Sequence, residues 1–204
     1  MIETISEELQ EQYQVVRRVI LTVHIEWYIA KQLFASGNDN IELLDWSANY
    51  AFEAIRSALY QSVILAICKL TDPTKMGKFE NLSLHRLADA IKDIDCNTEI
   101  FIKNCLFNED TFGDLHNIRN KVFAHFDLKN YDLKSFPGTE KIDKAIEILI
   151  KIINRIGKSI WQEEPLLEDI SHYAFPRWGD GNALLHKLRK YRESVFAFTG
   201  KDKG

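Results

Sequence analysis

The chain has few of the residues that build tight turns, disulfides or metal sites. It contains 9 Gly and 4 Pro among 204 residues, too few for the repeated turns of an all-β sandwich. Its three cysteines include no Cys-x-x-Cys pair, which argues against a disulfide framework or a zinc ribbon and fits a reducing compartment. No HExxH motif, GxSxG motif or Cys/His cluster at metal-ligand spacing occurs. We therefore expect no metal site, no cofactor and no serine nucleophile.

A basic leader and a long hydrophobic run are also absent. Residues 1–8 are acidic, and the longest apolar run, Ala58–Leu70, is interrupted by polar side chains and is too short to span a bilayer. Hydrophobic residues make up 46% of the chain and charged residues 27%, which is a composition for a folded core and not for a disordered segment. We expect a cytoplasmic protein that does not contact a membrane.

The net charge of −4 does not indicate a generally basic, nucleic-acid-binding surface. The charge is unevenly distributed, because residues 177–204 carry seven Lys/Arg against three Asp/Glu. This basic tail could hold a polyanion, or it could be an ordinary solvated surface helix. Both interpretations remain open at this point.

Apolar residues recur at three- and four-residue spacing along most of the chain, which predicts helices. The expected helices cover about residues 9–34, 46–70, 83–94, 110–126, 141–161 and 182–196. No segment has a convincing strand pattern. The sequence therefore predicts an all-α fold, a single bundle of about five or six helices.

The chain is expected to form one domain with three parts. Residues 1–45 hold an N-terminal helix packed on the bundle, and residues 46–161 form the helical core. Residues 162–204 hold an irregular segment and the basic C-terminal helix.

The predicted helix 110–126 contains a charged residue where an apolar one is expected. On a wheel of about 100° per residue, Arg119 falls inside the apolar stripe and His125 falls at its edge. A guanidinium in an apolar stripe is costly unless it is paired or hydrogen-bonded. Its partner could be a carboxylate of the same chain, a carbonyl at a helix end, or a subunit or ligand. Six residues separate Arg119 from His125, about 120° on a regular helix, so convergence needs a distorted helix, a shared groove or a second copy.

Arg119-Asn120 followed by His125 resembles the R-x(4–6)-H signature of the HEPN superfamily. The stretch Ile118–Asp127 and the second predicted helix, Leu59–Pro73, resemble the abortive-infection AbiU-like branch of that superfamily. The resemblance implies a small all-helical bundle that forms a two-fold dimer. It also implies a metal-independent endoribonuclease of phage-defence or toxin–antitoxin type, with RNA as its substrate and an antitoxin protein as a possible partner.

The resemblance also implies roles for individual residues. Arg119 would hold the scissile phosphate, and His125 would act as general base or general acid. Asn120 would orient one of them or contact the phosphate, and Lys121 would add phosphate attraction unless it is simply solvated. A dimer would bring two sets of Arg119 and His125 into one cleft.

Two other interpretations are compatible with the sequence. The first is a HEPN-fold module without catalysis, which uses the same groove to bind RNA, a nucleotide or a protein. The second is a helical scaffold in which Arg119 is a structural ion-pair residue. The other histidines, His116 among them, lack a partner pattern in sequence and are expected to be structural or at the surface.

Overall fold

The computed structural model describes residues 6–107, 109–120, 138–161 and 179–199. Among these residues the chain forms seven α-helices, one short π-helix and one two-stranded hairpin. The prediction of an all-α fold is confirmed. The helices outnumber the five or six expected, because one of them, α4, has no counterpart in the sequence-based prediction.

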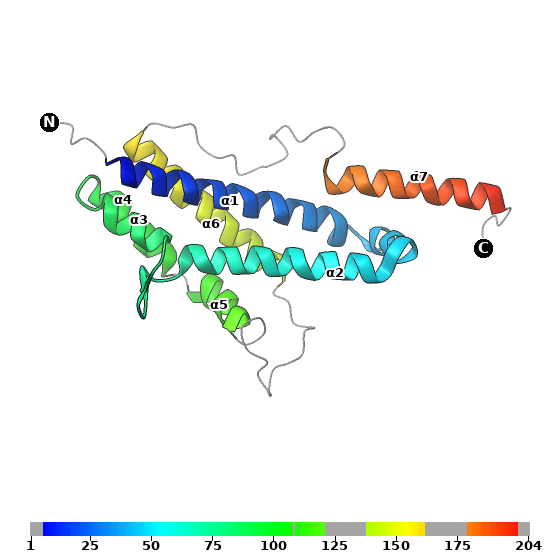
Figure 1. The fold of residues 1–204 in the computed structure, drawn as a ribbon, viewed down its shortest axis with the longest axis horizontal. Helices are drawn as coiled ribbons and strands as arrows, with labels where there is room; N and C mark the ends of the chain where they lie inside the picture. Colours follow the sequence, from blue (N-terminus) through cyan, green and yellow to red (C-terminus); the bar gives the residue numbers. More distant parts are fainter. Residues whose placement is uncertain (1–5, 108, 121–137, 162–178, 200–204) are drawn as a thin grey trace. The chain divides into compact units, whose positions relative to one another are not determined.

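Figure 1 shows the elements along the chain. In order they are α1 Glu7–Phe34, α2 Asn38–Thr71, β1 Lys75–Met76, β2 Phe79–Glu80, α3 Leu84–Ile91, α4 Cys96–Leu106, the π-helix η1 Glu109–Gly113, α5 Asp114–Ile118, α6 Thr139–Ile160 and α7 Gly181–Thr199.

The chain divides into two compact units. The first comprises Met1–His24 and Gln61–Glu168, and the second comprises Ile25–Tyr60 and Asp169–Gly204. In the first unit α4 packs against α3 and α6, and η1 packs against α6. Every described residue around Arg119 belongs to this first unit.

The apolar stripes of α1 and α6, which correspond to the predicted helices 9–34 and 141–161, are buried. In α6 the whole predicted stripe is buried: Ile142, Ala145, Ile146, Leu149, Ile152, Ile153 and Ile156. In α1 the same holds for Leu9, Tyr13, Val16, Ile20, Val23 and Trp27, each at most 4% exposed. Helix periodicity in the sequence thus identified the core-facing side of both helices.

Helix α2 is longer than predicted and is kinked at Ala48, whose φ of −168° is extended. It begins at Asn38 and not near residue 46, and its last residues, Val63–Thr71, are mostly buried. It ends at Thr71 because Pro73 keeps the preceding residue out of the helical region. By length and hydropathy alone, α2 is the one helix among the described residues that could cross a membrane, a criterion that core helices also meet.

Two local structures correct the sequence-based prediction. The segment expected to be a loop without strands forms an antiparallel hairpin that pairs Lys75 with Glu80, and Gly77 forms its turn with a φ of 61°.

Helix α4, the second correction, is capped by Asp95, whose carboxylate accepts hydrogen bonds from the backbone N–H groups of Asn97 and Thr98. Hydrogen bonding from the Thr98 side chain, the largest cause, lowers the pKa of Asp95 to about 2.

In the second unit, the start of α7 is fixed by the buried side chain of Gln32. Its Oε1 accepts hydrogen bonds from the backbone N–H groups of Gly181 at 2.8 Å and Asn182 at 3.3 Å. Its Nε2 donates to Asp180 at 3.0 Å. A Cβ at position 181 would lie 3.0 Å from the Gln32 side chain, so glycine permits this close approach. Gln32 therefore satisfies backbone donors that the first turn of a helix leaves without intrahelical partners.

Replacing Gln32 by alanine should destabilise the second unit by about 1–3 kcal/mol, because the Gly181 N–H would be left buried without an acceptor. Hydrogen exchange at the Gly181 and Asn182 amides measures the effect locally, and faster exchange is expected. Gln10→Ala, at an exposed position of α1, is the control. Unchanged exchange in Gln32→Ala would show that water replaces the side chain at no cost.

Candidate functional site

The helix that carries Arg119 is not a regular α-helix. It starts as the π-helix η1, continues as the five-residue α5, and returns to π geometry at Arg119 and Asn120. The regular helix predicted over residues 110–126 is therefore wrong in geometry over its described part. Single π turns are rare in proteins overall, but those that occur are often found at functional sites. His125 and Lys121 lie outside the described residues, so their positions stay predictions.

Arg119 is paired with a carboxylate from the end of α2. Its Nη1 donates to Asp72 Oδ1 at 2.7 Å and to Asp72 Oδ2 at 2.9 Å. The side chains are partly buried, with 18% of Arg119 and 12% of Asp72 exposed. The expectation that Arg119 needs a partner is thus met by the first of the three possibilities, a carboxylate of the same chain.

Asn120 lies beside the same guanidinium. Its side-chain Oδ1 accepts a hydrogen bond from Arg119 Nε at 3.1 Å, and its side chain is exposed. Among the described residues, Nη1 and Nε are the nitrogens of Arg119 that have partners, and Nη2 has none. Within this part of the chain, one amino group of Arg119 remains available to an oxyanion.

His116 joins the cluster from one turn before Arg119. Its Nε2 lies 2.9 Å from Thr71 Oγ1, and its Nδ1 lies 3.7 Å from Asp72 Oδ1. The Thr71 hydroxyl donates to the carbonyl of Ile67 at 2.9 Å, so it is available to His116 as an acceptor. The hydroxyl can instead donate to Nε2, in which case the proton of a neutral His116 sits on Nδ1 and faces the Asp72 carboxylate, so the tautomer of His116 decides between the two arrangements.

Two ionisable groups of the cluster have shifted pKa values. Burial, the largest cause, and the nearby Arg119 lower the pKa of His116 below its ordinary value, while Asp72 partly opposes them. Folding therefore favours neutral His116. Its contribution to stability is complete above the ordinary pKa of about 6.5 and is lost as the pH falls from that value through the lowered pKa of the folded chain. Burial also raises the pKa of the Cys68 thiol to about 12, so Cys68 does not supply a thiolate near neutral pH.

Sequence reasoning identified Arg119 and Asn120 but missed Asp72, Thr71 and His116. Asp72 is 47 residues away from Arg119 along the chain, and nothing local links the two. One usable signal was the spacing of His116, three residues before Arg119 and so on the same helix face. His116 was expected to be structural or at the surface, and its contacts with Thr71 and Asp72 are compatible with a structural role.

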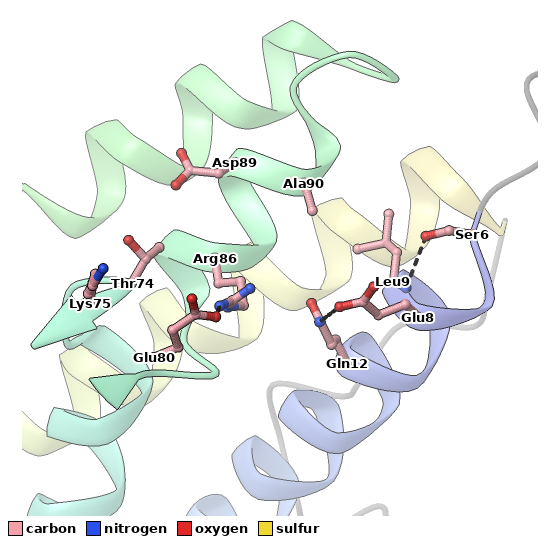
Figure 2. A pocket seen from close by; sticks show the side chains of 10 residues that line it. All are labelled: Ser6, Glu8, Leu9, Gln12, Thr74, Lys75, Glu80, Arg86, Asp89 and Ala90. Carbon is pink, nitrogen blue, oxygen red and sulfur yellow. Dashed lines mark hydrogen bonds and ion pairs between the residues drawn. The ribbon is translucent and has the colours of Figure 1, made fainter. Parts of the chain in front are cut away.

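A cavity of about 440 Å³ lies between the start of α1, the hairpin and α3 (Figure 2). Several of its charged side chains have protein partners: Arg86 pairs with Glu80, and Asp89 lies 3.2 Å from Lys103. Figure 2 shows Glu8 bonded to Gln12 on the opposite wall. The lining includes none of the residues around Arg119, so this cavity is not part of the candidate site.

The second unit exposes aromatic side chains on α2 and α7. Tyr50 and Phe198 are 92% and 93% exposed, and Trp46 contacts the rings of Tyr191 and Phe196 with centroids 6.1 Å apart in each pair. Exposed apolar groups that gather on one surface are typical of protein interaction sites. The sequence predicted only a basic character for this C-terminal helix.

The all-α fold and an Arg-Asn pair on a distorted helix define a HEPN-type helical protein, the class that the sequence resembles. The family model HEPN_AbiU2, described as AbiU2, matches residues 6–172, and the chain belongs to this family. It is thus an abortive-infection-related HEPN module. No match was found among curated proteins or among solved structures.

The environment of His116 can be tested by following its ring protons in an NMR titration. We expect a pKa below the ordinary value of 6.5 in the native chain. In Arg119→Ala the pKa should rise, because the neighbouring positive charge is removed while Asp72 remains. His186, exposed on α7, serves as the reference histidine in the same spectra. A His116 pKa that does not respond to Arg119→Ala would contradict the arrangement of the cluster.

Proposed function

We propose that this HEPN module is a metal-independent endoribonuclease of phage-defence type, with Arg119 and His125 as its catalytic residues. Arg119 binds a non-bridging oxygen of the scissile phosphate, and Asn120 helps to orient the guanidinium. His125 transfers the proton. Lys121 adds positive charge beside the phosphate.

The observation that carries this proposal is the geometry of Arg119. Its guanidinium is held near the surface by Asp72 and Asn120, with Nη2 unpartnered among the described residues. A permanently charged, planar donor of this kind suits phosphate oxygens. The π turn at Arg119 and Asn120 also departs from the regular helix on which the 120° separation of Arg119 and His125 was calculated.

The reaction needs no group beyond these side chains and the RNA. His125 removes the proton of a ribose 2′-hydroxyl, and the oxygen attacks the adjacent phosphorus. The bond to the 5′-oxygen of the next nucleotide breaks, and that oxygen takes a proton from an imidazolium. The products are a 2′,3′-cyclic phosphate and a 5′-hydroxyl. Arg119 stabilises the negative charge that builds up on the phosphoryl oxygens.

One imidazole per chain must serve as both base and acid, whereas a two-fold dimer offers two. We therefore place the active site in a homodimer in which two sets of Arg119 and His125 share a cleft.

The exposed aromatic residues of α2 and α7 provide a surface on which an antitoxin or another protein can pack.

One observation favours a different function. The ion pair between Arg119 and Asp72 is also what a helical scaffold with a purely structural arginine would have. A HEPN module that binds RNA, a nucleotide or a protein without cutting would keep the same groove. Only an activity measurement separates these functions from the nuclease.

The nuclease is tested with purified protein, single-stranded RNA of mixed sequence and excess EDTA. Wild-type protein should cleave the RNA and leave 2′,3′-cyclic phosphate ends, and an all-DNA strand of the same sequence should remain intact. Arg119→Ala should reduce the rate by about 10²–10³-fold. His125→Ala should reduce it by about 10²–10⁴-fold.

Matched control variants are available elsewhere in the chain. Arg86→Ala removes another arginine that is paired with a carboxylate, and His186→Ala removes an exposed histidine. Both should cleave at the wild-type rate. Equal cleavage by all five proteins would indicate a contaminating nuclease. Absence of cleavage with retained RNA binding would assign the chain to the non-catalytic modules.

An active site shared by two copies of the chain predicts that activity depends on dimerisation. Light scattering after size exclusion should give twice the mass of the 23.7 kDa chain. The cleavage rate per mole of protein should fall when the protein is diluted below the dissociation constant of the dimer. A rate per mole that stays constant into the concentration range of a demonstrated monomer would rule out a shared site.

A further inference from the structure

We propose that Asp72 is the positioning residue of this site: it holds Arg119 Nη1, so that Nη2 is presented to the scissile phosphate. The inference rests on the proposed function, since it names the residue that orients the phosphate-binding group. It concerns a carboxylate directly after α2, outside the Arg119–His125 signature.

The contact between the two side chains is suited to fixing an orientation. Both oxygens of Asp72 accept from the same nitrogen, Nη1, at 2.7 and 2.9 Å. Asn120 accepts from Nε on the other edge of the guanidinium at 3.1 Å. Because the guanidinium is planar, contacts at two of its nitrogens determine where the third one points. That third nitrogen, Nη2, has no partner among the described residues.

Asp72 is itself fixed by the elements around it. It directly follows the last residue of α2 and precedes Pro73, which limits its backbone to extended conformations. Thr71, next to it, is tied to the α2 carbonyl of Ile67 and to His116. The His116 ring lies against Asp72 with Nδ1 3.7 Å from Oδ1. The carboxylate is thus held by the end of α2 on one side and by α5 on the other.

The charge of Asp72 should affect the rate of cleavage and the binding of RNA in different ways. A free arginine side chain samples many rotamers and would lose this freedom on binding RNA. In this structure the ion pair has already restricted it. The benefit of such preorganisation appears in the rate of the bound complex, whereas the negative charge of Asp72 slightly opposes RNA binding. Removing the charge should therefore lower kcat and leave KM unchanged or lower.

The test compares Asp72→Asn with the wild-type chain, using end-labelled single-stranded RNA under the assay conditions given above. Asp72→Asn has nearly the same shape without the charge, and we expect kcat to fall by about 10²-fold, the loss typical of a misplaced catalytic group. Asp72→Glu, which keeps the charge, should recover part of the lost kcat. Asp93→Asn removes the same charge from an exposed position of the first unit and should leave kcat and KM unchanged.

A second measurement reports the orientation of Arg119 without any RNA. The Nη1 proton signals of Arg119, assigned by their loss in Arg119→Lys, report the hydrogen bonds to Asp72 and should exchange slowly with water in the wild-type chain and rapidly in Asp72→Asn. Circular dichroism confirms that each variant is folded at the assay temperature. A stability role alone would lower the melting temperature and leave both these signals and kcat unchanged in the folded protein.

The possible outcomes separate the two proposals. If the wild-type chain cleaves and Asp72→Asn cleaves with the same kcat, Asp72 is not a positioning residue and the nuclease stands. If KM rises and kcat is unchanged, Asp72 acts in binding and the inference is wrong. If the wild-type chain does not cleave at all, the nuclease fails, and the role of Asp72 in it fails as well. Unchanged Nη1 proton signals in folded Asp72→Asn overturn the positioning role whatever the cleavage result.

Discussion

The ion pair between Asp72 and Arg119 is the interaction on which the arrangement of the site depends. Each charge alone would be costly where it lies, because about four fifths or more of each side chain is shielded from water. Removing one partner from such a pair usually costs more than the pair contributes, since it leaves a partly buried charge uncompensated. The end of α2 and the turn after α5 are therefore tied to each other, and His116 and Thr71 fill the space between them.

Long, regular features of the fold were predictable from the sequence, and short ones were not. The stripes of α1 and α6 repeat over several turns, so the apolar period is visible and the buried face follows from it. Helix α4 has 11 residues and only two buried ones, Thr98 and Ile102, so it has no such period. The hairpin has two residues in each strand, too few for an alternating pattern to be visible.

The candidate site was also predictable only where it leaves a local pattern in the sequence. Arg119 interrupts an apolar stripe, and that local anomaly can be detected in a linear sequence. The identity of its partner could not be detected, because Asp72 approaches only after α2 and α5 have folded. A wheel drawn at a constant angle also cannot show the π turns on either side of α5, which depart from the spacing of 100° per residue that the wheel assumes.

In the proposed nuclease, the same ion pair would limit how the site attracts RNA. Because Asp72 offsets the charge of Arg119, the described part of the site presents little net positive charge, and the chain as a whole carries −4. Attraction of a polyanion depends on local excess positive charge, so a single copy of this cluster would bind RNA weakly. In the proposed homodimer, two copies facing one groove would double the number of guanidinium groups with an available amino group. The proposed dimer would thus serve the binding of RNA as well as the transfer of protons.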